Sequence, residues 1–461
     1  MGLTSDLNVS VQSLMASTQA MDVTTTNIAN ANTPGYARRT VDFEETAPVG
    51  TDGSTGVDVA AIQSMRDTVL DLSIDAATSQ QNMSNTVASS LSAVQTQFSD
   101  TASGSIGSSL DSFFSSLQQL STNPADSSLR TSVLTTAGNL ASSFQSTASA
   151  ITQAQQQSDQ AVVQATGDAN SLLQQIAATN AQINTAQSLG QSDNSFQDQL
   201  SNQLTQLSAI IDFKTVNSSD GLTLTTANGS PLVVGGKAYA LTNSTTSSGF
   251  NDVYAGGVDI TGDIQGGTLG GDIQTRDQTL ATMNTQLDQL AFQFAGAVNN
   301  VQAAGSDANG NAGAALFNPP DTTTGTATGA ASSIAVALTS GSQLAAAASG
   351  GASGDNTNLA NMINLQNQSI INGNTPTDAF SNLTFSIGNT ISQATSSATA
   401  TGNIVTQLQN QQGSVEGVSL DEESSNLVLY ERSYQAAAKV ISTVDTLMGN
   451  LLDMGVTNPG Y

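Results

Sequence analysis

An apolar residue recurs every three or four positions near the C-terminal end of the chain. The line lies between Leu420 and Met454, and no proline or glycine interrupts it before Gly449. This heptad spacing predicts a helix with one apolar face, and the acidic residues 421–423 suit its N-terminus. The line consists of Leu427, Tyr430, Tyr434, Ala437, Ile441, Val444, Met448 and Leu451. Because a lone helix of this kind is marginal in water, its apolar face needs a partner.

The N-terminal end of the chain offers that partner. A second line of apolar residues repeats every seven positions there, at Leu7, Leu14, Met21 and Ile28, with Leu3 and Val11 beside it. The simplest interpretation pairs the first and last helices, so that everything between them is one long excursion. Two ordinary amphipathic helices packed on separate cores remain the alternative, because a period does not identify a partner.

The charge balance excludes several kinds of partner and site. The chain has 9 basic and 36 acidic residues, a net charge of −27, and neither cysteine nor histidine. Such a chain repels nucleic acid and anionic membranes, and it has no disulfide or thiolate chemistry. No apolar run approaches the roughly 18 residues of a membrane span, so no membrane insertion is expected. A basic, apolar secretory signal is also missing, which predicts a cytoplasmic protein or one exported with its terminus uncleaved.

A turn-rich motif ends the N-terminal helix. Positions 27–30 read NIAN and positions 33–38 read TPGYAR. Proline cannot continue a helix, so a plain helix stop is one interpretation of this stretch. The motif also resembles the N-terminal signature of bacterial flagellar rod, hook and hook-associated proteins. That resemblance adds Asn30, Pro34, Gly35 and Tyr36 to the residues expected to serve assembly.

Periodicity divides the rest of the chain. A helix is expected from Ala61 to Ser99, and further helices joined by short breaks, one of them capped by Asp126, reach Ile211, which predicts an antiparallel bundle. From Phe213 the period becomes 2, and Asp220-Gly221 and Asn228-Gly229 are strong hairpin turns. The expected class is α+β, mainly α, with paired terminal coiled-coil helices, a long antiparallel helical bundle and a small inserted β-domain. The expected divisions are 1–60 and 402–461 for the axial segments, 61–212 and 272–401 for the bundle with a flexible loop at 304–354, and 213–271 for the β-domain.

Further stretches narrow the family. Positions 228–235 read NGSPLVVG and positions 266–271 read GGTLGG, and both resemble stretches particular to the hook-associated protein 1 branch of the flagellar axial proteins. Positions 417–423, GVSLDEE, and 439–445, KVISTVD, resemble the C-terminus of the same branch. One departure is that Asp198-Gln199 is followed by Leu200, where the family often has arginine, so any ion pair of that arginine is in doubt.

The resemblance implies a structural subunit that forms the junction between hook and filament by helical self-assembly of its terminal helices. It implies export by the flagellar type III apparatus to the extracellular flagellum. The implied partners are copies of the chain in a ring or tube, the hook protein, a second hook-associated junction protein, and an export chaperone at the C-terminal helix. Another axial component of the hook or rod type is the alternative.

No catalytic, cofactor or metal site is expected. The acidic cluster at 421–423 sits where a helix start favours it, and the lysines fall in no Ser-x-x-Lys pattern. Residues 307–311, DANGN, lack the glycine and glutamate positions of a calcium loop, which favours a surface turn. The glycines between 256 and 271 lack the lysine of a phosphate loop and are expected to be turns. A secreted hydrolase built on carboxylates and a surface adhesin remain as alternatives from other classes.

Overall fold

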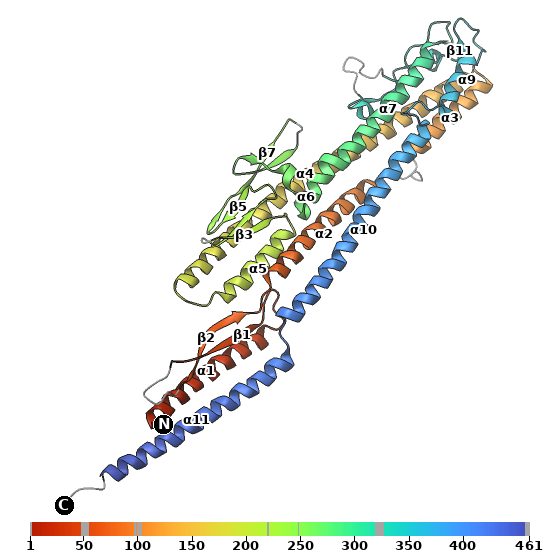
Figure 1. Cartoon of the computed structure of the whole chain (residues 1–461). Coiled ribbons are helices and arrows are strands. Elements are labelled where there is room, and N and C mark those ends of the chain that lie inside the picture. The colour runs from red at the N-terminus through yellow and green to blue at the C-terminus, as the bar shows by residue number, and fades with distance from the viewer. Residues whose placement is uncertain are drawn as a thin grey trace, which may run out of the picture.

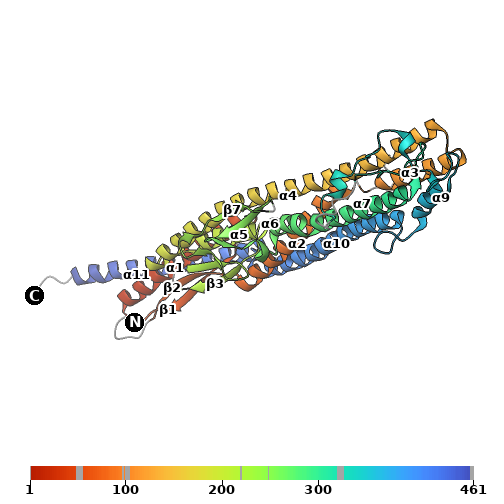
Figure 2. The ribbon, with the colours of Figure 1, turned by 90° about the horizontal axis from the view of Figure 1, so that it is seen from above.

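The chain folds into a long, mainly helical molecule with both termini near one end (Figures 1 and 2). The computed structural model describes residues 2–47, 55–95, 98, 104–218, 221–247, 249–318 and 327–456. The long helices are α1 (Leu3–Asn30), α2 (Thr68–Gln95), α3 (Ile106–Thr122), α4 (Ser127–Ser188), α5 (Asn194–Ser208), α7 (Leu280–Ala303), α10 (Pro376–Glu416) and α11 (Leu420–Val456). Small antiparallel sheets complete it, so the expected mainly helical α+β class is confirmed.

The first and last helices lie side by side and antiparallel, as the two apolar lines predict (Figure 1). A two-stranded hairpin, β1 (Arg39–Glu45) and β2 (Val57–Ser64), packs along α1. The helix expected to begin at Ala61 is therefore wrong at its start, because residues 57–64 form a strand and α2 begins at Thr68. Pairing with β1 outweighs the helix propensity of the alanines at 60 and 61.

The bundle continues from the terminal pair toward the far end of the molecule. Helices α2 and α10 lie together in its near half, while α3, α4 and α7 pack around an aromatic core in its far half (Figure 1). Asp126 caps α4 by accepting hydrogen bonds from the backbone of Ser128 and Leu129, as expected of that residue. The expected division at 402 falls inside α10, which runs unbroken to Glu416. One interior glycine costs a helix only about 1 kcal/mol, which packing on α2 offsets.

The segment 304–354, predicted to be a flexible loop, contributes to the far core. Its elements are short: β10 (Gly305–Ser306), α8 (Ala330–Ser333), the 3₁₀ turn η4 (Gly341–Gln343) and β11 (Ala347–Ala348). Yet Leu316, Phe317 and Leu344 are fully buried in that core. Apolar residues at irregular spacing show no period, so the sequence did not reveal this packing. Most of the low-complexity stretch 319–329 lies outside the described residues. Helix α9 (Thr357–Asn364) and the 3₁₀ turn η5 (Leu365–Asn367) then lead to α10.

The expected β-domain forms two small antiparallel sheets against α4. One sheet has the order β3-β4-β5-β6 and the other β7-β8-β9. Their strands are β3 (Lys214–Ser218), β4 (Gly221–Thr225), β5 (Pro231–Val234), β6 (Lys237–Ala238), β7 (Leu241–Thr245), β8 (Asn251–Ala255) and β9 (Val258–Asp259). The turn at Asn228-Gly229 joins β4 to β5 as predicted, whereas Asp220 lies outside the described residues.

The last glycines expected to be turns form a helix instead. After the 3₁₀ turn η2 (Thr261–Asp263), α6 (Gly267–Gln274) packs on α2 and passes into the π-helix η3 (Thr275–Thr279). A Cβ on Gly271 would lie 2.7 Å from Thr86 Cβ and 2.8 Å from the carbonyl oxygen of Met83. This glycine is therefore explained by close helix packing rather than by a turn.

Candidate assembly interface

The two predicted apolar lines meet, but with a different contact row on each helix. On α11, Ala437 and Val444 are buried against α1, and Leu427, Tyr430 and Ile441 are half-buried. Tyr434, Met448 and Leu451 are exposed. The buried row of α11 therefore repeats every seven residues through Ala437 and Val444. The other residues of the predicted line lie beside this row, on the flank of the helix, and are half-buried or exposed.

On α1 the buried row is small and polar. Leu7, Leu14, Met21 and Ile28 are only half-buried. The side chains that are buried belong to Ser10, Ala16, Ser17, Ala20, Val23, Thr24 and Asn27. Small side chains let two helices approach closely, so the pair buries little apolar volume of its own. The end of α11 extends past α1 (Figure 1) and leaves Leu452 and Met454 exposed.

The turn motif positions the hairpin on the two helices through Asn27. This side chain is 1% exposed; it donates to the carbonyl oxygen of Arg39 at 2.8 Å and to Glu423 Oε2 at 3.1 Å. The Tyr36 hydroxyl donates to Asn27 Oδ1 at 2.7 Å, and burial raises the pKa of Tyr36. Sequence reasoning selected Asn30, whose side chain makes only local contacts: it donates to the carbonyl oxygen of Thr26 and accepts from Thr33 Oγ1. An asparagine aligned with the buried face of a helix was the signal for Asn27.

Gly35 and Pro34 carry the chain out of α1 toward the bundle. Gly35 has φ +77, which favours glycine, and its carbonyl oxygen accepts from Arg66 Nη2 at 2.6 Å. Pro34 lies beside Tyr36 in a shallow polar cavity that α5 also lines. The motif thus stops the helix, as the plain interpretation requires, and also joins the terminal pair to the bundle.

Three arginines hold that joint together, and we name Arg38, Arg39 and Arg66 with their acidic partners the arginine joint. Arg38 forms ion pairs of 2.8 Å with both Glu422 and Glu423 at the start of α11. The acidic cluster at 421–423 was expected only to favour a helix start, but two of its carboxylates also form ion pairs with Arg38. Arg38 and Glu423 are 385 positions apart in the sequence, so no local sequence pattern predicts their contact.

The other two arginines share Asp198 of α5. Arg39 pairs with it at 2.9 Å and Arg66 at 2.7 Å, so this carboxylate has arginine partners although Leu200 replaces the familial arginine nearby. Arg66 also pairs with Asp71 of α2 at 2.8 Å. Three of the chain's 9 basic residues therefore form ion pairs where the hairpin, α2 and α5 meet.

The end of α10 completes the joint through Glu416. Its side chain accepts from the backbone N–H of Asp67 at 2.8 Å, and its carbonyl oxygen accepts from the N–H of Arg38 at 2.8 Å. Burial raises the pKa of Glu416, which is 4% exposed. Partly buried charged contacts of this kind fix geometry because leaving one partner alone is costly. The joint therefore sets the direction of the terminal pair relative to the bundle.

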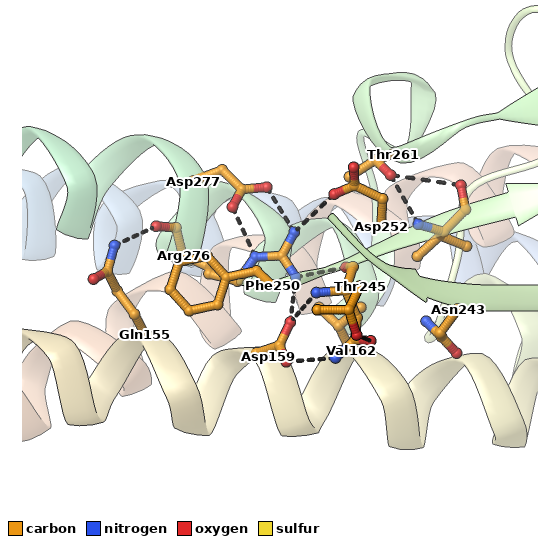
Figure 3. A network of polar contacts seen from close by, with 12 residues as sticks. Gln155, Asp159, Val162, Asn243, Thr245, Phe250, Asp252, Thr261, Arg276 and Asp277 are labelled. Atoms are coloured by element: carbon orange, nitrogen blue, oxygen red, sulfur yellow. Dashed lines mark hydrogen bonds and ion pairs between the residues drawn. The ribbon is translucent and has the colours of Figure 1, made fainter. Parts of the chain in front are cut away.

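A second charged centre attaches the β-domain to the bundle (Figure 3). Arg276, in the π-helix η3, is fully buried and pairs with Asp159 of α4 and with Asp277, both at 2.7 Å. It also donates to the carbonyl oxygen of Asn251 in β8 at 2.7 Å, and its guanidinium lies 5.4 Å from the centre of the Phe250 ring. The Arg276 guanidinium and its carboxylate partners are paired with one another inside the protein, so this centre is a structural attachment.

Candidate reactive sites are scarce in the described part of the chain. Within it, no group of three acidic, histidine or cysteine side chains is placed to hold a metal ion. Asp307 accepts from the backbone N–H groups of Asn309 and Asn311, a self-contained turn. None of the described helices has the length and hydropathy required to cross a bilayer.

Comparison with known proteins gives consistent matches along the chain. Residues 91–317 match the flagellar hook-associated protein FlgK helical domain, residues 411–454 the flagellar basal body rod FlgEFG protein C-terminal, and residues 7–36 the flagella basal body rod protein. Flagellar hook-associated protein 1 of Salmonella typhimurium is 28% identical over 98% of this chain and 100% of the relative. The protein of the same name from Bacillus subtilis is 28% identical over 98% of each chain.

A solved structure has the same fold. The flagellar hook junction protein FlgK from Burkholderia pseudomallei superposes with a TM-score of 0.67 at 19% identity, covering 75% of this chain and 100% of that chain.

Proposed function

The chain belongs to the flagellar hook-associated protein 1 family, and we propose that it builds the hook–filament junction through its terminal helices. It is a structural subunit of the bacterial flagellum. The observation that supports assembly through α1 and α11 is the apolar surface that their pairing leaves open. Leu429, Leu447, Leu451 and Leu452 are all more than two-fifths exposed, with Leu452 at 69%.

That surface continues onto the hairpin. The ring of Phe43 in β1 lies 6.2 Å from that of Tyr430 in α11, tilted by 56°, and both rings stay partly exposed. A long exposed apolar strip on one helix pair is unusual for a protein that functions as a monomer. We therefore propose that the half-buried and exposed members of the two apolar lines contact neighbouring subunits in a ring or tube.

The proposed partners are those that the family resemblance implies. The proposed neighbours are other copies of the chain, the hook protein on one side and a second hook-associated junction protein on the other. We propose export through the flagellar type III apparatus to the cell exterior, with an export chaperone covering α11 beforehand. A catalytic role is not proposed, because the carboxylates of the two charged centres are engaged in structural contacts.

Electron microscopy of cells that lack the gene tests this function. Hooks without filaments are the expected result, together with loss of motility that a plasmid copy of the gene restores. Normal filaments on the deletion strain would contradict the proposal. Mass spectrometry of purified hook–filament preparations shows whether the chain is part of the flagellum. It therefore distinguishes a chain that is absent from the flagellum from one whose role there is redundant.

A further inference from the structure

Two adjoining cavities lie between α2, α5 and the β-domain, away from the terminal helices. Their volumes are about 500 Å³ and about 640 Å³. Leu72, Asp75 and Thr215 line both, so the cavities meet and form one groove, which we call the β3 groove. Helix α2 forms one wall and strand β3 the other. The combined space suits an extended peptide rather than a single side chain.

Over residues 214–217, strand β3 presents to this groove an edge that no second strand covers in the described part of the chain. It is the first strand in the order β3-β4-β5-β6, and within the described residues it pairs only with β4. In an antiparallel strand, alternate residues direct their N–H and C=O groups away from the existing partner. Val216 in its centre is 56% exposed. The edge strand of a sheet is the structure to which another chain adds a strand.

The opposite wall carries buried polar groups that the chain does not fully satisfy. Asp75 is 4% exposed and accepts one hydrogen bond, from Thr205 Oγ1 at 2.8 Å. Burial, with the like charge of Asp71 as a smaller cause, raises the pKa of Asp75 to about 7. One turn further along α2, Ser79 Oγ is buried and has no hydrogen-bond partner. Both side chains line the groove.

The basic side chains that line the groove are engaged elsewhere. Among its described lining residues these are Arg66, paired with Asp71 and Asp198, and Lys214, which donates to the carbonyl oxygen of Ala227 at 2.9 Å. A buried carboxylate without a cation favours an incoming one. With 9 basic residues against 36 acidic ones, another copy of this chain is a poor source of it.

We propose that the β3 groove docks an extended segment of a different flagellar protein, which adds a strand to β3 and places a lysine or arginine beside Asp75. The inference rests on the proposed function, which brings other flagellar subunits against this chain. It assigns to the β-domain a role separate from the terminal helices, that of holding a neighbouring protein at the outside of the assembly.

Site-specific photocrosslinking in purified flagella tests the proposal. Because the chain has no cysteine, Val216→Cys gives a single attachment point for a benzophenone label. Val258→Cys on β9 is the matched control, since Val258 is 57% exposed and lies in the other sheet of the same domain. We expect the label at position 216 to join one segment of another flagellar protein that contains lysine or arginine. The control label should give at least about tenfold less of that product.

A second pair of variants tests the charge. Asp75→Asn in the Val216→Cys background should lower the yield of the product about tenfold, because the charge-assisted contact is lost. Asp168→Asn, at an exposed carboxylate of α4, removes the same charge and should leave the yield unchanged. A melting curve of each variant shows whether it folds.

The outcomes separate the two claims. Absence of the chain from purified flagella would overturn the proposed function and this inference with it. Incorporation with no product at position 216, with equal products at both labels, or with a yield indifferent to Asp75→Asn would overturn the docking site alone. A product formed with a second copy of the chain would replace the proposed partner and likewise overturn it.

Discussion

The far half of the bundle and the terminal helix pair bury very different side chains. In the bundle, the rings of Phe113 and Phe294 lie 6.0 Å apart, and Phe317 lies 5.9 Å from Phe294, all three fully buried. In the terminal pair the buried residues are small, such as Ala20 and Ala437, while the larger apolar residues lie on the flanks. The bundle therefore satisfies its apolar surface internally, and the terminal pair does not.

This contrast explains how one chain can be both stable and ready to assemble. Apolar burial contributes roughly 25 cal/mol for each Å² removed from water, so the aromatic core supplies far more stability than a row of serine and alanine. The arginine joint between the two regions fixes their relative direction through ion pairs and hydrogen bonds. Surface left open on α1 and α11 can then be buried by neighbours without dismantling the bundle.

The largest effect on the monomer is expected from the aromatic core. Phe294→Ala removes a ring that contacts Phe113, Phe114 and Phe317, and should lower the free energy of unfolding by about 3–5 kcal/mol. Chemical denaturation monitored by circular dichroism measures it. Phe385→Ala on α10 is the matched control, because that ring is 74% exposed. Equal losses for the two variants would show that the core does not dominate the stability.

A smaller loss is expected at the joint. Arg66→Met leaves Asp71 without its arginine partner and Asp198 with Arg39 alone, and should cost about 3 kcal/mol. Its side chain is 8% exposed, so water replaces the lost contacts poorly. Limited proteolysis should also cut sooner between the hairpin and α2. Arg432→Met, on the exposed face of α11, should change neither measurement. An unchanged cleavage pattern in Arg66→Met would argue against the joint as the element that orients the terminal pair.

The pH dependence of stability should belong to the bundle. Asp75 has a folded pKa of about 7, raised by burial and by Asp71, and accepts a hydrogen bond only from Thr205 of α5. Asp212 and Lys214 line the groove beside it. The folded protein keeps this proton over a range where the unfolded chain, with its pKa near 3.8, has lost it. Stability from this group is therefore fully present below about pH 4 and falls as pH rises to about 7.

Asp75→Asn removes that dependence. From pH 5 to pH 8 the wild-type protein should lose roughly 2–3 kcal/mol through Asp75, and the variant should not. Burial also raises the pKa of Asp272 to about 7, against the pull of Arg276, so some pH dependence will persist. Thermal melts at several pH values measure both. An identical pH profile for variant and wild type would mean that Asp75 is ionised in the folded protein at pH 5.

The sequence predicted the periodic parts of this molecule and missed the contacts between distant segments. The heptad line of α11 and the capping of α4 by Asp126 were readable because each is a local pattern. The pairing of Arg38 with Glu422 was not, since charge at a helix start has a sufficient local explanation. Gly271 was read as a turn because sequence does not show that Thr86 and Met83 of another helix crowd it. The apolar line of α1 was visible, but not that Ser17 and Thr24 occupy the contact row instead.

The smallest effect on the monomer, and the largest on assembly, is expected at Ile441. This residue is half-buried on the flank of α11, three positions before Val444, which is buried against α1. An aspartate on the flank can turn its carboxylate to water, so Ile441→Asp should change the melting temperature of the monomer by no more than about 2 °C, well below the effect of a core substitution. In the assembled junction the same carboxylate would face a neighbouring subunit, and incorporation and motility should be lost.

Two controls make this last result decisive. Ser442→Asp, at an exposed position of the same helix, should assemble normally, and Val444→Asp should lower the melting temperature because that side chain has no route to water. Secreted protein must be quantified first, since a chaperone bound to α11 could also lose affinity. If Ile441→Asp instead melts as early as Val444→Asp, the flank of α11 belongs to the folded monomer. The open surface would then be narrower than proposed, and the terminal pair would be as self-sufficient as the bundle.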